Sequence, residues 1–413
     1  MSTKLKVTIL ASSLAILLFT IVGGFVNVRA SSNDGAYRQL SVYSEVLSRI
    51  RLEYVEEPNI PVVTDGALHG LLESLDANSS YLSAAEYKRY KTTMKTDGKA
   101  DIGATVSKRF GYADVVAVIP GGPADKAGVE NSDIIESIAG KSTHDMSLAE
   151  IRGMLSGEVG STITVAVVRP RRAEPEKIVI TRDVVTIPPV SDKMLADNVG
   201  YIKVDAFPEG KTQEIAAKIR DLQKQGAKKL VLDLRNSASG AESEGVATAN
   251  LFLDHGTITY LQGQKYPRQA FNADPAKDIT RLPVAVLVNR GTAGPAEIVA
   301  AAILENARGD VVGDKTFGDG SVQKLIEMPD NSALILSVAK YYSPGGKAIQ
   351  DASVTPNVVV ADAIEDDGGL PDVDEQAAPG EKPGEKKDEK PKNLQDDQLN
   401  KALEVLKNRE SKG

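Results

Sequence analysis

Apolar residues between positions 38 and 95 recur every three or four residues, which is the spacing of an amphipathic helix. Two stretches show this spacing, formed by Leu40, Tyr43, Leu47 and Ile50 and then by Leu68, Leu71, Leu72 and Leu75. The segment LDANSSYL, Leu75–Leu82, ends the second stretch in a turn, and Ser83 can cap a further helix that begins at Ala84. Residues 38–95 are therefore predicted to form an N-terminal helical region.

Shorter apolar runs separated by turns follow over residues 99–183. Val115–Ile119 has the composition of a strand, and Ile163–Val168 alternates apolar and polar residues as a half-buried strand does. A helix is predicted where Leu148, Ile151 and Leu155 share one face. The pattern indicates a compact β-rich module.

Strands alternate with helices over residues 190–362. Four short apolar strands are predicted at Val199–Val204, Leu230–Leu234, Val284–Val288 and Val311–Val312. The runs between them have helical spacing, and this alternation favours an α/β layer with a largely parallel sheet. Ligands of such sheets bind at the carboxyl ends of the strands. Two of those ends lead into unusual loops, at residues 235–240 and 291–295.

The first 30 residues are typical of an export signal. Lys4 and Lys6 precede an uncharged apolar stretch over residues 7–26. A stretch of this length can span a bilayer, so both cleavage after Ala30 and retention as a membrane anchor stay open. The positive flank keeps the N-terminus in the cytoplasm and sends the body across the membrane. The predicted location is therefore extracytoplasmic, either periplasmic or membrane-anchored.

The C-terminal segment, residues 363–413, is acidic. Residues 363–393 are rich in Asp, Glu, Lys, Pro and Gly and are predicted to be disordered. Helical spacing returns at Leu399, Leu403 and Leu406, which indicates a short terminal helix that either docks on another surface or frays.

Composition excludes several classes of chemistry. The chain of 413 residues has no cysteine, so disulfides, thiolate catalysis and cysteine-based metal sites are excluded. Its three histidines, His69, His144 and His255, are far apart and lack metal-ligand spacing. Asp310, Asp314 and Asp319 do not have the spacing of a Ca²⁺ loop. The net charge of −8 indicates no basic face for nucleic acid. We therefore expect no metal, no cofactor and no nucleic-acid partner.

The segment GTAGPAEI, Gly291–Ile298, follows a buried strand and opens a helix. A sharp turn from a strand into a helix N-terminus is a common place for a nucleophile, because backbone N–H groups there can stabilise an oxyanion. Gly294 and Pro295 occupy this turn, and neither has a reactive group. Glu297 stands where a capping box places its carboxylate, and glycine at the N-cap costs only a few tenths of a kcal/mol relative to serine.

Several segments, in this order, resemble the carboxy-terminal processing peptidases, also called tail-specific proteases. LDANSSYL is similar to the family's Leu-Asp-Pro-His-Ser-Ser-Tyr motif, and IPGGPADKAGVENSDIIESIAGKS is close to its PDZ pattern. Core motifs of the family are matched by LVLDLRN, VNRGTA, EIVA, VGDKTFG, SVQ and VTPNVVV. The resemblance covers residues 38–360. It implies an α/β fold, with a crotonase-like or ClpP-like core over 190–362, an inserted PDZ domain over 99–183 and the N-terminal helical region.

The resemblance also implies a site. The family cleaves exported proteins near their C-termini with a serine nucleophile, a lysine base and a glutamine that orients the lysine. The serine position falls on Gly294, the lysine position on Asp319 and the glutamine position on Gln323. The family's Asn-Pro-Gly-Gly loop, an oxyanion contributor, reads Ser237-Ala238-Ser239-Gly240, so Ser239 and Gly240 are the oxyanion-loop candidates.

The missing nucleophile and base predict a pseudoprotease. Two alternatives stay open. One is an active serine-type endopeptidase with a non-standard site, for which Thr292, Ser239, Ser321 and Lys315 are the nearest candidates. The other is a structural subunit that assembles with an active relative.

Peptide binding by the PDZ segment does not depend on either of the substituted side chains. Asp101–Ala104 resembles the loop that receives a peptide's terminal carboxylate on its backbone N–H groups. The predicted peptide-binding residues are Ile102, Gly103, Ala104, Leu148 and Ile151. Protein or peptide C-termini are the predicted partners, with the membrane as a further partner of the N-terminal segment. The competing interpretation is a PDZ domain that serves only as a structural insert.

Overall fold

A computed structural model describes residues 34–94, 100–109, 111–169, 174–350, 352–361 and 396–410. The predicted signal or anchor segment and the predicted disordered segment lie outside the described residues. The chain divides after Leu68 into two compact units. The first contains helix α2 (Asp34–Glu53) and the first turns of α3 (Ile60–Glu73). No helix of the described part combines the length and apolar character needed to cross a bilayer.

The second unit begins with the end of α3 and strand β1 (Ser80–Leu82), followed by α4 (Ala84–Met94). The start at Ala84 is the predicted one. Ser83 caps the helix in a capping box, because its Oγ accepts from the Glu86 N–H at 3.5 Å while its own N–H donates to Glu86 Oε2 at 2.8 Å. The segment predicted as a turn ends in β1, a strand that the local pattern does not predict and that pairs antiparallel with β16 (Ala333–Tyr342). Tyr81 and Leu82 are buried by this pairing, and their burial outweighs the local pattern.

Residues 100–183 form a β-rich module. Its strands are β2 (Ala104–Arg109), β3 (Tyr112–Val118), β4 (Ile134–Ile138), β6 (Thr162–Val168) and β7 (Glu176–Thr181), in the order β2-β3-β4-β6-β7, with β5 (Lys141–Ser142) beside β4. Helix α5 (Pro123–Lys126) follows the Pro-Gly-Gly turn, and α6 (Leu148–Leu155) begins where Ser147 Oγ accepts a bond from the Glu150 N–H at 3.2 Å. The buried face of α6 is the predicted one, Leu148, Ile151 and Leu155.

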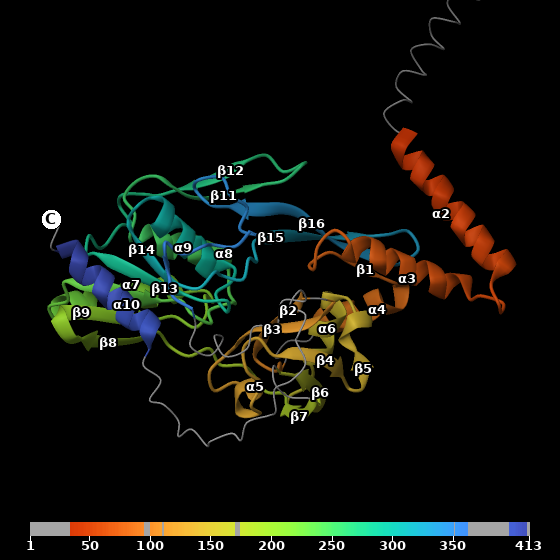
Figure 1. Cartoon of the computed structure of the whole chain (residues 1–413), viewed down its shortest axis with the longest axis horizontal. Helices are drawn as coiled ribbons and strands as arrows, with labels where there is room; N and C mark the ends of the chain where they lie inside the picture. Colours follow the sequence, from red (N-terminus) through yellow and green to blue (C-terminus); the bar gives the residue numbers. More distant parts are fainter. Residues whose placement is uncertain are drawn as a thin grey trace, which may run out of the picture. The chain divides into compact units, whose positions relative to one another are not determined.

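The α/β core is built on a second sheet, and β8, β9, β13 and β14 of this sheet are labelled in Figure 1. Its strand order is β17-β14-β13-β10-β9-β8. Its strands are β8 (Ser191–Leu195), β9 (Val199–Lys203), β10 (Lys229–Asp233), β13 (Val284–Val288), β14 (Gly309–Gly313) and β17 (Val358–Val359). All neighbouring pairs are parallel except β8 and β9. The central strands β10 and β13 are buried at every residue, because both faces of the sheet are covered.

Helices cover the two faces of this sheet differently. Helices α7 (Lys211–Lys224), α8 (Glu242–Asn250) and α9 (Pro295–Glu305) belong to the larger buried cluster, around Phe207, Ile219 and Val286. Helix α10 (Asp397–Glu410) packs on the other face, where fully buried Ala402 and Leu406 contact the apolar strand residues. Of the two predicted outcomes for the terminal helix, docking and fraying, the structure shows docking on the core sheet.

A third sheet is antiparallel. It contains β1, β16, β11 (Thr257–Gln262) and β12 (Gln269–Asn272), with β15 (Ser321–Glu327) also paired to β16. Strands β15 and β16 pair antiparallel and are joined by a turn at Pro329-Asp330-Asn331. This sheet places the loop before Ser321 beside the start of α9.

Candidate functional site

The turn into α9 has a strained backbone that glycine tolerates. Gly294 has φ 60° and ψ −121°, between the end of β13 and the first helical residue, Pro295. A side chain at this position would start in open space, since a Cβ built on Gly294 meets no atom within 4 Å. The turn therefore has room for a nucleophile at its apex but presents only a backbone.

Glu297 ties the two predicted dyad positions together. One carboxylate oxygen of Glu297, Oε2, accepts from the backbone N–H of Gly294 at 3.0 Å and from that of Asp319 at 2.8 Å. The other oxygen accepts from the Gly318 N–H at 2.8 Å and from the Thr316 hydroxyl. The structure thus brings Gly294 and Asp319 to the same carboxylate, although they are far apart in sequence.

Burial dominates the electrostatics of this carboxyl group. Glu297 is completely buried, and burial raises its pKa to about 8, although its hydrogen bonds act in the opposite direction. The nearby Asp319 carboxylate adds to the increase. Burial therefore keeps this carboxyl group largely protonated at neutral pH.

The Asp319 loop is also fixed from the β1 side. Asn78 Nδ2 donates to Asp319 Oδ1 at 3.4 Å and to Ser321 Oγ at 3.1 Å. Gln323 is exposed, and its side-chain amide donates to Ser321 Oγ at 2.7 Å. Gln323 is thereby connected to Asp319 through Ser321 and Asn78.

The loop predicted to contribute to an oxyanion site packs tightly against the chain before α7. The carbonyl of Ser239 accepts from the Phe207 N–H at 2.7 Å. Gly240 has φ 126°, and a Cβ there would lie 2.2 Å from the Phe207 carbonyl oxygen, so this position requires glycine. Ser237 is fully buried, and among the described residues its hydroxyl has no hydrogen-bond partner.

The hydroxyl and amine groups nearest to Gly294 have other roles. Thr292 is fully buried, and its hydroxyl donates to the Leu234 carbonyl at 2.8 Å while accepting from the Asn289 N–H at 3.0 Å. Ser321 Oγ is bonded to two amides, and Lys315 is exposed. Within the described part of the chain, no contact pairs one of these hydroxyls with a base.

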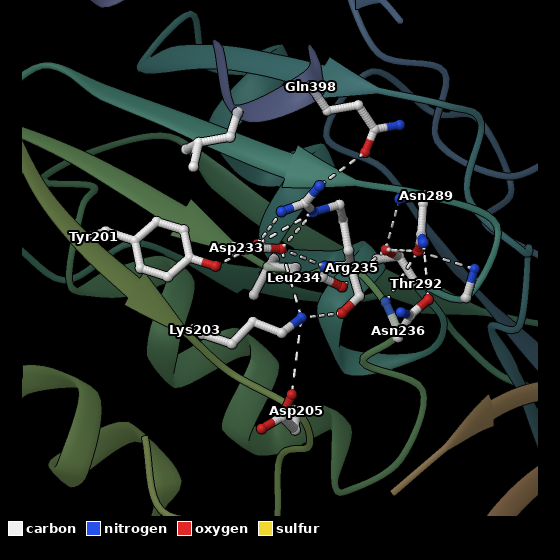
Figure 2. A network of polar contacts seen from close by, with 12 residues as sticks. Tyr201, Lys203, Asp205, Asp233, Leu234, Arg235, Asn236, Asn289, Thr292 and Gln398 are labelled. Atoms are coloured by element: carbon white, nitrogen blue, oxygen red, sulfur yellow. Dashed lines mark hydrogen bonds and ion pairs between the residues drawn. The ribbon is translucent and has the colours of Figure 1, made fainter. Parts of the chain in front are cut away.

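A polar network lies at the carboxyl ends of β9 and β10 (Figure 2). Buried Asp233 accepts from the Tyr201 hydroxyl at 2.6 Å and from the Arg235 guanidinium at 2.6 Å, while Lys203 lies 3.5 Å away. Burial raises the pKa of Asp233, but the neighbouring cations outweigh this effect and hold it below its usual value. The network borders an open cavity of about 520 Å³.

The same network fixes the C-terminal helix. Arg235 donates to Asp396 Oδ2 at 2.9 Å. It also donates to Gln398 Oε1 at 3.3 Å, and Figure 2 shows this second bond. Arg235 immediately precedes Asn236, whose N–H and side chain are bonded to Asn289. Helix α10 therefore supports the loop that leads to Ser239 and Gly240. Sequence reasoning missed this link, because the ion pair joins residues 161 positions apart.

The predicted peptide-binding residues of the PDZ module form a closed arrangement. Ile102, Leu148 and Ile151 are buried in the module's core, so they do not line an open slot in this structure. The Gly103 N–H donates to Asp101 Oδ1 at 2.9 Å, and Asp101 Oδ2 accepts from the Ser156 hydroxyl at 2.7 Å. The loop thus holds one of its own carboxylates where a peptide carboxylate is expected.

The PDZ module also contacts the core beside Gly294. Val116 and Ala117 of β3 form one apolar cluster with Ala238 and Ala293 of the two core loops, and Phe317 packs against it. A Cβ on Gly291 would lie 3.0 Å from the Val116 carbonyl oxygen, which shows how closely the backbones approach. From α6, Arg152 interacts electrostatically with Asp319.

Comparisons with known proteins agree with this architecture. Residues 198–360 match the model of peptidase family S41, and residues 115–169 match a PDZ domain model. The carboxy-terminal-processing protease of Bartonella bacilliformis is 31% identical over 358 residues, covering 83% of this chain and 82% of the relative. The carboxyl-terminal-processing protease of Picosynechococcus is 34% identical over 301 residues, covering 71% and 72%. The structure of the photosystem II D1 C-terminal processing protease superposes with a TM-score of 0.65 at 28% identity, covering 76% of this chain and 86% of that one.

Proposed function

Because the chain belongs to the carboxy-terminal processing protease family, peptidase family S41, we propose that it is an exported member without peptidase activity that binds protein C-termini through its PDZ domain. One observation carries the first half of the proposal. Gly294 and Asp319, which resemble the family's serine and lysine positions, donate to one Glu297 oxygen and supply neither a nucleophile nor a base. The scaffold of the site is kept while its reactive groups are absent.

The loss of either group removes the chemistry. Acyl transfer by a Ser-Lys pair needs a hydroxyl that attacks and a neutral amine that takes its proton. Asp319 cannot replace the amine, because Gly294 has no hydroxyl group that a base could deprotonate. Thr292 is buried with its hydroxyl engaged, which counts against a rebuilt site.

Incubation of the purified protein with an unfolded protein and with peptides ending in apolar residues tests this half. We expect no cleavage by mass spectrometry and no labelling by a serine-reactive phosphonate. Cleavage that disappears in Thr292→Ala, Ser239→Ala or Ser321→Ala would establish an active, non-standard site instead.

The second half of the proposal depends on backbone groups. The Gly103 and Ala104 N–H groups belong to a loop that resembles the carboxylate-binding loop of PDZ domains and precedes the matched residues 115–169. A peptide carboxylate has to displace Asp101 from the Gly103 N–H. Peptides that end in an apolar residue should bind with affinities on the order of micromolar to tens of micromolar.

Calorimetry on the whole protein tests peptide binding. The C-terminal amide of the same peptide lacks the charge that the loop receives, so its affinity should fall at least several-fold. Equal affinity for acid and amide, or no heat from a varied set of peptides, would assign the PDZ domain a structural role. Binding to an active relative would then become the better account of the protein.

A further inference from the structure

The outer edge of β2 is where a peptide strand can add to the PDZ sheet. Among the described strands, β2 ends the sheet order, and α6 packs beside it. Residues of antiparallel strands pair one to one. If the last residue of a peptide pairs with Ala104, the third residue from its end lies beside Val106.

Arg152 occupies this position in the closed arrangement. Its guanidinium Nη2, extending from α6, donates to the Val106 carbonyl oxygen at 3.1 Å. Arg152 lies one turn after Leu148 and is exposed, so its side chain can move without disturbing the core of the module. A guanidinium stays charged at all ordinary pH values. The third residue of a bound peptide would therefore meet a permanent positive charge.

Arg152 also interacts electrostatically with a carboxylate of the core. The Asp319 carboxylate attracts it from the loop before β15. Half-buried Glu242 also interacts electrostatically with Asp319. A lysine at position 319 would repel Arg152, whereas the aspartate draws the guanidinium toward the core. An apolar contact also holds the PDZ module against the core. It is formed by Val116 and Ala117 with Ala238 and Ala293.

We propose that Arg152 makes the edge of β2 beside α6 selective for C-terminal peptides with an acidic side chain at the third position from the end, and that this side chain competes with Asp319 for the guanidinium. The proposal rests on the proposed peptide binding and names its ligand class. It also gives Asp319 a role. A peptide binds only if its acidic side chain attracts the Arg152 guanidinium more strongly than Asp319 does.

The experiment compares three peptides that end in the same apolar residue and differ only at the third position from the end, as Glu, Gln or Lys. Binding to the full protein is measured by fluorescence anisotropy. The Glu peptide should bind about fivefold or more tightly than the Gln peptide, and the Lys peptide should bind most weakly, because an ion pair at a partly exposed site is worth about 1 kcal/mol. The difference should shrink as salt is raised to about 1 M.

Variants separate the two parts of the proposal. In Arg152→Gln, the Glu, Gln and Lys peptides should bind with equal affinity. In Arg152→Lys, the order of affinities should stay the same, with smaller differences. Asp319→Asn should strengthen binding of the Glu peptide by a few-fold, since the competitor is gone. Asp314→Asn is the matched control, because this loop carboxylate pairs with Arg290 at 3.1 Å, and it should change nothing. Circular dichroism and thermal unfolding check that each variant folds. If Arg152→Gln fails to fold, Arg152→Lys carries the test.

Each outcome decides a different point. Equal binding of the three peptides, or a preference for Lys, overturns the selectivity and leaves the proposed peptide binding intact. A Glu preference that is unaffected by Asp319→Asn overturns the competition with the core. Failure of every peptide to bind overturns both this proposal and the proposed function.

Discussion

The start of α9 and the Asp101–Ala104 loop both present backbone N–H groups at a turn, but they depend on side chains to different degrees. At the start of α9, the Gly294 N–H is kept and bonded to Glu297, yet a peptidase of this family would also need a hydroxyl and an amine there. At the PDZ loop, recognition of a carboxylate needs only the N–H groups themselves. Substitution can therefore remove chemistry from the first turn while leaving binding at the second.

The packing around the two turns differs as well. Glu297 is fully buried and accepts from three backbone N–H groups and one hydroxyl. The PDZ loop is held by Asp101, which accepts from Gly103 and Ser156. The first turn is thus held rigidly by four hydrogen bonds to a buried carboxyl group. A peptide carboxylate at the second turn would need to replace only the carboxylate of Asp101. The predictions below test this difference, beginning with the largest expected effect.

Restoring both reactive groups should restore weak activity. A Cβ at Gly294 meets open space, so Gly294→Ser fits, although its positive φ costs about 1–3 kcal/mol in a residue other than glycine. The double variant Gly294→Ser, Asp319→Lys should cleave a peptide substrate detectably by mass spectrometry, and neither single variant should. Loss of one oxyanion donor lowers the rate by about 10²–10³, so the altered loop at Ser237–Gly240 should keep turnover low.

If the double variant cleaves no peptide, the backbone geometry of the turn also differs from that of an active peptidase. A crystal structure would locate the fault. A serine Oγ and lysine Nζ more than about 5 Å apart would mean that the turn no longer supports proton transfer.

Removing the buried carboxylate should loosen the core turn. Glu297→Ala leaves the N–H groups of Gly294, Gly318 and Asp319 without their acceptor. Each buried donor left unpaired costs about 1–3 kcal/mol, so the free energy of unfolding should fall by at least about 3 kcal/mol in urea titrations. Glu297→Gln keeps the shape and one acceptor oxygen, and its loss should be smaller. An alanine variant as stable as the parent would contradict the rigidity ascribed to this turn.

The sequence predicted most of these elements because they are local. The strands β9, β10, β13 and β14 and the buried face of α6 follow from hydrophobic spacing, and the start of α9 follows from Gly294 and Pro295. The capping role of Ser83 follows from the carboxylate three residues later. The positions resembling the dyad also follow from motif spacing, and the structure places both against Glu297.

What the sequence missed depends on contacts between distant segments. Strand β1 exists because β16 offers it a partner, which no pattern within LDANSSYL reveals. The roles of Asn78 and Arg152 arise from loops brought beside Asp319 by the fold. Ile102, Leu148 and Ile151 have the residue types of an apolar slot and of a buried core alike, so spacing alone could not separate the two.

The stability of the core turn should depend on pH through Glu297. Burial raises the pKa of its carboxyl to about 8, above the value of about 4.5 of the unfolded chain. The folded state therefore binds the proton more tightly than the unfolded state does between these values. Stability from this group is fully present below pH 4.5 and is lost as the pH rises toward 8.

The difference between the parent and Glu297→Gln isolates this effect, because other groups titrate alike in both. The free energy of unfolding of the parent should fall relative to the variant between pH 5 and about 8. A relative rise of the parent over this range would mean that the carboxylate is ionised in the folded protein, held by its four donors.

The smallest effect is expected at the PDZ loop, where Ser156→Ala removes the hydroxyl that donates to Asp101 Oδ2 at 2.7 Å. This side chain supports a loop with N–H groups, as Glu297 does, but it is half-buried and neutral. The free energy of unfolding should fall by about 1 kcal/mol or less, because one neutral hydrogen bond contributes about 0.5–1.5 kcal/mol. Affinity for a peptide with an apolar last residue should stay within about threefold of the parent in anisotropy titrations, since the receiving N–H groups remain. A tenfold loss of affinity would show that the PDZ loop also depends on one particular side chain, and the contrast between the two turns would then fail.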